Sequence, residues 1–201
     1  MLRNAEPADV EALARIYNQA MRPGSNVTAR LSEVDSAERR AWLAGFVPPF
    51  GVWVYEHTRS SIVGWCSLAP FAVRPRLPNL AEVSLYVDEK FRSGIIAARL
   101  LCYVVNEARG REFRSLVSIA SDKNVSSLSG SIAYGFRQTA TLYEVGRLSG
   151  TLANATWLQK DLRQDDPPQY RSMRDSMLTA AGVPRYELTP TGVVAIQPEA
   201  G

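Results

Sequence analysis

Three strand-like segments follow one another between helical segments, and this order restricts the fold more than any other feature of the chain. Residues 51–56 and 61–68 predict a β-hairpin, and residues 81–87 alternate polar with apolar side chains as a half-buried strand does. The spacing of apolar residues then changes to that of a long helix at 95–109. A doubly wound sheet would need strict alternation of strands and helices. The sequence therefore predicts a mixed α/β (α+β) fold.

The remaining segments give the order β-α-α-β-β-β-α-β-α-β-β for residues 1–162, which we expect to form one domain. This order predicts a mixed central sheet of about seven strands flanked by about four helices. Composition changes near 165–168, so residues 163–201 are expected to be a C-terminal extension, with a short helix at 171–180. The further strands are expected at 2–5, 115–120, 136–147 and 155–162, and the further helices open at 7–9, 32 and 124.

Charge and composition exclude several classes of function. The formal net charge is +3 and the arginines are scattered rather than gathered in a run, so we expect no nucleic-acid partner. Cys66 and Cys102 belong to no CxxC or Cys/His set, so we expect two buried free thiols and no metal site. His57 is the only histidine and falls at an expected turn, which argues against a Ser-His-Asp or Cys-His triad.

No segment has the composition of a targeting or membrane-spanning sequence. The first residues lack the apolar region of a signal peptide, and no apolar run approaches the ~20 residues that span a bilayer. We therefore expect a cytoplasmic location and no membrane partner.

Short phrases that follow one another along residues 2–162 carry a family resemblance. The phrases are Ile16-Tyr17-Asn18, Val63-Gly64-Trp65, Ala69-Pro70-Phe71, the strand at 81–87, the loop around Arg92, Asn124 with Tyr134-Gly135-Phe136, Glu144-Val145-Gly146 and the run at 157–161. Together they resemble the GCN5-related N-acetyltransferase (GNAT) superfamily, and in particular its phosphinothricin acetyltransferase-like branch, whose members acetylate small amines. The resemblance implies an N-acyltransferase that moves an acyl group from a pantetheine thioester to the amine of a small molecule. Dimers are common among such relatives, so a homodimer is also considered.

The resemblance also implies a donor site for acetyl-CoA or another acyl-CoA. In such enzymes the strand at 81–87 splays away from the next strand, which leaves its backbone amides open to the pantetheine arm. A loop and the start of the following helix then hold the pyrophosphate, because unpaired amides at a helix N-terminus bind anions. Asn124 would serve equally well as a helix N-cap. The implied donor-binding residues are Leu85, Tyr86, Val87, Arg92, Ser93, Gly94, Ile95, Ile96, Ala97 and Asn124.

Glu82 is the residue that the resemblance implies for catalysis. An amine must lose a proton as it attacks a thioester, and a carboxylate can accept that proton directly or through a water. The structural alternative is an exposed strand glutamate. Positions where relatives carry histidine or tyrosine hold Ser131 and Ser149, so one of these or a water is expected to protonate the leaving thiolate. Candidates for the acceptor site are Trp65, Phe71, Arg74 and Tyr143, of which Trp65 and Phe71 would serve equally well in packing.

One position in the phosphate loop departs from the family pattern and keeps other interpretations open. Ile95 stands where relatives have a glycine, and its β-branched side chain should crowd a pyrophosphate and resist an unusual φ. A donor whose phosphopantetheine is attached to an acyl-carrier protein would not need that glycine. A catalytically silent GNAT fold used for binding or regulation is the third interpretation, and the retained Glu82 argues against it.

Overall fold

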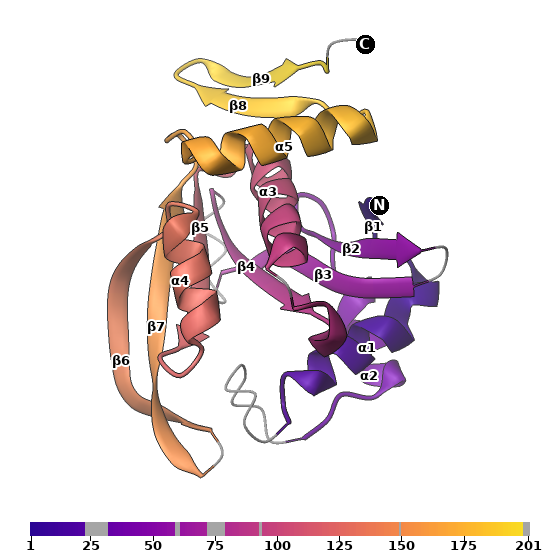
Figure 1. The fold of residues 1–201 in the computed structure, drawn as a ribbon, viewed down its shortest axis with the longest axis vertical. Coiled ribbons are helices and arrows are strands. Elements are labelled where there is room, and N and C mark those ends of the chain that lie inside the picture. The colour runs from indigo at the N-terminus through magenta and orange to yellow at the C-terminus, as the bar shows by residue number, and fades with distance from the viewer. Residues whose placement is uncertain (23–31, 59–60, 72–78, 93, 149, 199–201) are drawn as a thin grey trace.

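Seven strands form one mixed sheet in the spatial order β1-β2-β3-β4-β5-β7-β6 (Figure 1). A computed structural model describes residues 1–22, 32–58, 61–71, 79–92, 94–148 and 150–198. Pairing is parallel between β4 and β5 and antiparallel between all other neighbours. The predicted mixed sheet is therefore confirmed. Its strands are β1 (Leu2–Asn4), β2 (Gly51–Thr58), β3 (Ser61–Pro70), β4 (Leu80–Val87), β5 (Ser115–Ser121), β6 (Arg137–Leu148) and β7 (Thr151–Asp161).

Helices cover both faces of the sheet because successive strand residues point to opposite sides. In β2, Val52 and Val54 pack with Leu13 of α1 (Val10–Gln19), on the face that α2 (Ser36–Ala44) also covers. The residues that follow them in β2, Trp53 and Tyr55, point to the opposite face. They belong to the core under α3 (Ile95–Gly110) and α4 (Val125–Ala133). Two short 3₁₀ turns, Pro7–Asp9 and Glu89–Phe91, precede α1 and α3.

Local capping signals set where the helices begin. Asp35 accepts a hydrogen bond of 2.8 Å from the backbone N–H of Glu38, so α2 begins at Ser36 rather than near residue 32 as expected. Asn124 accepts one of 3.2 Å from the N–H of Ser127 at the start of α4. Its predicted capping role is confirmed.

The parallel pairing between β4 and β5 is short. It joins residues 80–82 to residues 115–117 and ends at Glu82 and Val117. β4 continues to Val87 in register with β3, and β5 continues to Ser121 in register with β7. The two strands therefore separate after Glu82, as the resemblance implied.

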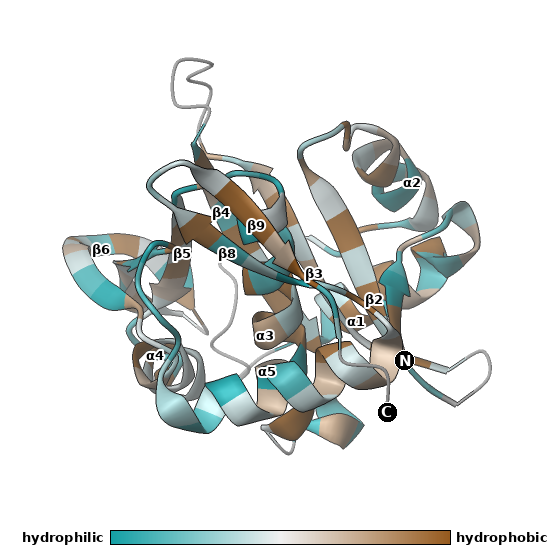
Figure 2. Cartoon of the chain, turned by 90° about the horizontal axis from the view of Figure 1, so that it is seen from above, coloured by the Kyte–Doolittle hydropathy of each residue, from teal (hydrophilic) through white to brown (hydrophobic). Residues whose placement is uncertain are grey.

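The chain after Leu162 forms a helix and a hairpin that pack on α3. The expected helix at 171–180 is present as α5 (Pro168–Ala181), and α5 crosses over α3 in Figure 1. A two-stranded sheet of β8 (Arg185–Thr189) and β9 (Gly192–Ile196) follows and was not expected. The Pro and Gly residues that suggested an irregular end instead form its turn. In Figure 2, α5 is largely hydrophilic and β9 largely apolar.

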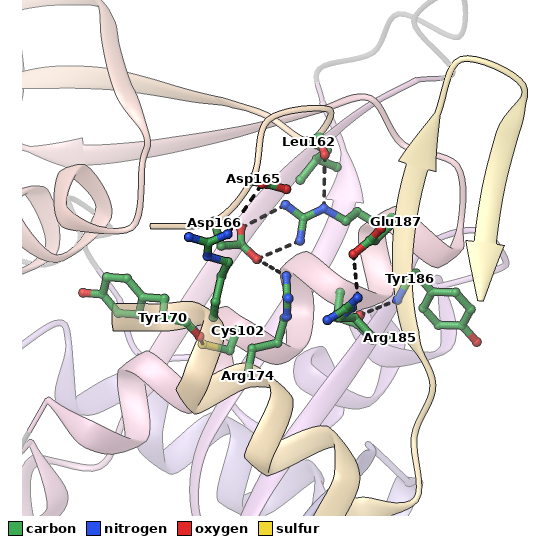
Figure 3. A network of polar contacts seen from close by, with 12 residues as sticks. Cys102, Leu162, Asp165, Asp166, Tyr170, Arg174, Arg185, Tyr186 and Glu187 are labelled. Carbon is green, nitrogen blue, oxygen red and sulfur yellow. Dashed lines mark hydrogen bonds and ion pairs between the residues drawn. The ribbon is translucent and has the colours of Figure 1, made fainter. Parts of the chain in front are cut away.

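Asp166 joins this segment to the rest of the fold. Its side chain is fully buried and bonds Arg109 of α3, Arg174 of α5 and Lys160 of β7 at 2.7–3.2 Å. Figure 3 shows the bond between Asp166 and Arg174. Cys66 and Cys102 are free and buried, as predicted. Within the described ranges, no helix is long and apolar enough to cross a bilayer, and no group of three His, Cys, Asp or Glu side chains is placed to hold a metal ion.

Candidate active site

A cleft of about 450 Å³ opens where β4 and β5 separate. Its walls are residues 83–87 of β4, residues 118–120 of β5, the first turns of α3 and one side of α4, and we call it the β4–β5 cleft. Seven of the expected donor-binding residues line it, namely Leu85, Tyr86, Val87, Arg92, Gly94, Ala97 and Asn124. Ile95 and Ile96 lie outside this lining, and Ser93 lies outside the described residues.

The two ends of the cleft offer different backbone groups. Beyond Glu82, the side of β4 that faces β5 has no strand partner among the described residues, which leaves backbone N–H and C=O groups open to a ligand. The carbonyl of Val87 is an exception, because it accepts a hydrogen bond of 3.4 Å from Arg92. At the other end, Ala98 donates to the carbonyl of Gly94, and the amides before Ala98 begin α3 without a side-chain cap. Such a helix start carries partial positive charge and favours an anion.

Gly94 supplies the backbone conformation that the loop needs. Its φ is +82°, and a Cβ built there would meet no atom within 4 Å, so the space beside it is open. Ile95 does not adopt a positive φ, and its side chain is 53% exposed. The expected conflict between Ile95 and an unusual φ therefore does not arise, because the glycine one position earlier takes that conformation.

A second cavity, of about 280 Å³, lies on the α1–α2 side of β4. Tyr17, Trp42, Trp65 and Tyr86 supply aromatic walls, and we call it the aromatic cavity. Glu82 lines it, and Ser84 and Tyr86 line both this cavity and the β4–β5 cleft. The two cavities therefore meet along one strand, with Glu82 at the point where β4 and β5 part.

Arg39 brings a cation into the aromatic cavity. Its guanidinium carbon lies 4.5 Å from the ring centres of both Tyr17 and Trp42, and the residue is only 4% exposed. Cation–π contacts with desolvated aromatic rings stabilise such a buried charge. Glu38 lines the same cavity. A ligand here would thus meet one cation, two carboxylates and flat apolar walls.

Glu82 is partly buried, and burial raises the pKa of its carboxyl group above the usual value. A raised pKa makes a carboxylate a stronger base, because its protonated form is relatively more stable. The position of Glu82 and its pKa both suit a proton acceptor for a group bound in the aromatic cavity.

The other expected site residues fall into three groups. Ser131 lines the β4–β5 cleft and Trp65 lines the aromatic cavity. Phe71 and Tyr143 line neither cavity. The ring of Phe71 packs edge-to-face on that of Trp157 with 5.4 Å between their centroids, and Tyr143 is 76% exposed on β6. Arg74 and Ser149 lie outside the described residues.

Arg39 and Trp42 in the aromatic cavity and Tyr170 in the β4–β5 cleft were not expected as site residues. Arg39 and Trp42 lie in the helix expected to begin near residue 32, and one helical turn places both near the cavity. An arginine on the apolar side of a helix was the one available signal. Tyr170 gave none, because its place depends on how α5 docks.

Comparisons with known proteins agree with this geometry. The model of the acetyltransferase (GNAT) family matches residues 11–129, which is more than half of the chain. A Bacillus subtilis (strain 168) protein named "Putative phosphinothricin acetyltransferase YwnH" is 29% identical over 161 residues, covering 80% of this chain and 98% of its own. The L-amino acid N-acyltransferase MnaT of Escherichia coli (strain K12) is 28% identical over 171 residues, covering 83% of this chain and 96% of its own.

A solved structure shows the same fold. The yncA protein of Salmonella typhimurium, solved with its cofactor acetyl-CoA, superimposes with a TM-score of 0.73 at 25% identity, covering 84% of this chain and 96% of that one. The separated strands, the glycine-led helix start and these matches agree with one another. The chain belongs to the acetyltransferase (GNAT) family and is an enzyme of N-acyl transfer.

Proposed function

We propose that this enzyme transfers an acyl group, in the first place acetyl, from acyl-CoA to the amine of a small amino-acid-like molecule. The observation that carries the proposal is the meeting of the β4–β5 cleft and the aromatic cavity along β4, with Glu82 between them. A thioester in the cleft and an amine in the cavity would approach each other at that point.

The β4–β5 cleft fits an acyl-CoA donor at both ends. The unpaired edge of β4 suits the amide groups of the pantetheine arm, and the start of α3 suits phosphate. Arg92 also lines the cleft and adds a cation near the helix start. These features support a nucleotide-bearing donor. An acyl-carrier protein would bring only the single phosphodiester of its phosphopantetheine, and no nucleotide, to this end of the cleft.

The aromatic cavity fits an acceptor that carries both an amine and a carboxylate. Arg39 suits the carboxylate and Glu82 the amine, while Trp42 and Trp65 suit an apolar side chain. The indole N–H of Trp65 is buried without a hydrogen-bond partner among the described residues, so a ligand oxygen would satisfy it. Relatives named for L-amino acids and for L-methionine sulfoximine support this class of acceptor.

The chemistry follows from the placement of these groups. The bound thioester supplies an electrophilic carbonyl carbon. Glu82 accepts a proton from the amine as its nitrogen forms the new C–N bond and the C–S bond breaks. The departing sulfur takes a proton from Ser131, which lines the cleft, or from water. The products are an amide and free thiol. Glu82 then releases its proton to solvent, and Ser131, where it was the donor, takes a proton back from solvent.

The test is a calorimetric titration with acetyl-CoA beside acetyl-pantetheine, followed by turnover with a panel of L-amino acids. We expect tighter binding of acetyl-CoA than of acetyl-pantetheine, and acetylation of amino acids that carry apolar side chains. Turnover with an acetylated carrier protein but not with acetyl-CoA would show that the carrier protein, and not acyl-CoA, is the donor. Binding without turnover of any amine would favour the silent fold, which the transferase names of the relatives do not support.

We also propose that two copies associate through the β6 edge of the sheet. Among the described strands, β6 has only β7 as a neighbour, and it exposes Leu142, Tyr143 and Val145. An open sheet edge can pair with another chain, and an exposed apolar patch can mark a protein–protein contact. Sedimentation equilibrium should give twice the chain mass, and Tyr143→Arg should reduce it to the monomer.

We propose a cytoplasmic location as well, consistent with the two free thiols.

A further inference from the structure

The C-terminal segment reaches the β4–β5 cleft through one side chain. Tyr170, in the first turn of α5, lines the cleft together with Leu101 of α3, Ser131 of α4 and Phe136. Among the residues described after Leu162, Tyr170 alone belongs to this lining. The matches to relatives span nearly the full length of those proteins but only about 80% of this chain. The unmatched fifth is about the size of the segment after Leu162.

Neighbouring side chains hold the ring of Tyr170 in place. Its centroid lies 4.5 Å from that of Tyr134, with the rings tilted by 55°. Its carbonyl accepts a weak hydrogen bond of 4.0 Å from the thiol of Cys102 on α3. Its N–H donates to the carbonyl of Pro167 at 2.9 Å. Tyr170 is therefore packed between α3 and the end of α4.

Buried ion pairs fix α5 on both sides of Tyr170. Asp166 lies four residues before it and Arg174 four residues after it, and these two side chains bond each other at 2.7 Å. Arg109 of α3 donates to both carboxylate oxygens of Asp166 at 2.8 and 2.9 Å. Figure 3 shows the ring of Tyr170 pointing away from this network. The network thus anchors the helix and leaves the ring to face the cleft.

The position of Tyr170 along α3 indicates which part of a donor it would touch. Cys102, its neighbour, lies seven residues after Ile95, or about 10 Å along the helix axis from the end that suits phosphate. Leu101, Phe136 and Tyr170 all line the cleft and belong to one hydrophobic cluster, so they form an apolar part of its wall. Such a wall suits the methylene groups of a pantetheine arm and not a phosphate.

We infer that the C-terminal segment completes the donor site and that Tyr170 is a donor-binding residue for the pantetheine arm. This inference rests on the proposed acyl-CoA donor. Removing the ring should weaken binding of every donor that has the arm, whether or not it carries the nucleotide. Removing a residue that contacts phosphate would instead weaken only the binding of acetyl-CoA.

The experiment compares dissociation constants for acetyl-CoA and acetyl-pantetheine in the wild-type enzyme, Tyr170→Ala and Tyr186→Ala. Tyr186 is a matched control, since it is a tyrosine of the same segment whose ring packs on Gly110 at the far end of α3 and lies outside the cleft lining. We expect Tyr170→Ala to weaken both donors by about tenfold and Tyr186→Ala to change neither.

A measurement on the wild-type enzyme keeps the inference testable if Tyr170→Ala does not fold. Acetyl-pantetheine should slow amide hydrogen exchange in the first two turns of α5. Unchanged exchange there, or wild-type affinity of a folded Tyr170→Ala, would overturn the inference while leaving the proposed function intact. Failure of the wild-type enzyme to bind or use acetyl-CoA would overturn the proposed donor itself.

Discussion

Glu82 of β4 and Val117 of β5 are the last partners in the only parallel pairing of the large sheet, as far as the described strands extend. The strands separate beyond this pair, and the β4–β5 cleft fills the opening. Glu82, the proposed base, therefore lies where the cleft begins, and its side chain also lines the aromatic cavity. In the proposed arrangement, the end of this ladder of hydrogen bonds would place the two substrates on either side of the Glu82 carboxylate.

Replacing Glu82 by Gln tests the base directly. The amide keeps the size of the side chain but cannot accept a proton, so kcat should fall by about 10²- to 10⁴-fold. The dissociation constant of acetyl-CoA should stay within about twofold, because Glu82 is absent from the cleft lining. Steady-state kinetics and calorimetry measure the two effects. Glu89→Gln, at an exposed carboxylate paired with Arg22, is the control and should leave both constants unchanged.

The pH dependence of the reaction should report the same group. Burial raises the pKa of Glu82, and the base must be deprotonated to act, so kcat/KM should rise with pH through that raised pKa. The acidic limb is therefore expected above the ordinary glutamate value of about 4.3. Glu82→Gln should remove this limb. A limb that persists in the variant would assign the titration to another group.

Arg39 should set the affinity for the acceptor. Arg39→Lys keeps the charge but loses the planar fork that binds a carboxylate with two hydrogen bonds. We expect KM for an L-amino acid to rise about 10- to 100-fold, with donor affinity unchanged. The matched measurement uses an amine that lacks the carboxylate, whose KM should be the same in both enzymes. An equal loss for both acceptors would contradict a carboxylate contact.

Local patterns in the sequence were enough to predict the sheet. Alternation in 81–87 and helical spacing in 95–109 gave β4 and α3 nearly to the residue. The β8–β9 hairpin was missed because its Pro190-Thr191 turn is as typical of an irregular tail as of a hairpin. What decides between them is packing against α3, for example Tyr186 on Gly110, which local sequence does not contain.

The same distinction between local pattern and long-range packing applies to the residues of the site. Glu82 and the residues of β4 follow from one strand and its resemblance to a family, so their placement beside the cleft could be expected. Arg39 and Tyr170 enter through helices that dock from distant parts of the chain. The sequence pattern placed the glycine requirement at Ile95, whereas the structure has its positive φ one position earlier, at Gly94.

Asp166 should be the most sensitive residue for the stability of the fold. It is one buried carboxylate among three buried cations, Arg109, Lys160 and Arg174. Removing its charge would leave Arg109 and Lys160 without a carboxylate partner among the described residues, whereas Arg174 would keep its ion pair with Asp175. Asp166→Asn should lower the free energy of unfolding by about 3–5 kcal/mol, as measured by urea denaturation. Asp165→Asn is the adjacent control, since Asp165 is 87% exposed and its ion pair with Arg171 spans 3.7 Å. It should change stability by less than about 0.5 kcal/mol.

The same residue predicts how stability depends on pH. Burial alone would raise the pKa of Asp166, but the hydrogen bonds and charges of Arg109, Lys160 and Arg174 lower it below the usual value. A carboxyl group whose pKa is lower in the folded state stabilises the fold fully above its unfolded pKa of about 3.9. That contribution is lost as pH falls from there through the lowered pKa. Wild-type stability should therefore drop more steeply below about pH 4 than that of Asp166→Asn, and parallel curves for the two proteins would show that Asp166 does not carry this charge.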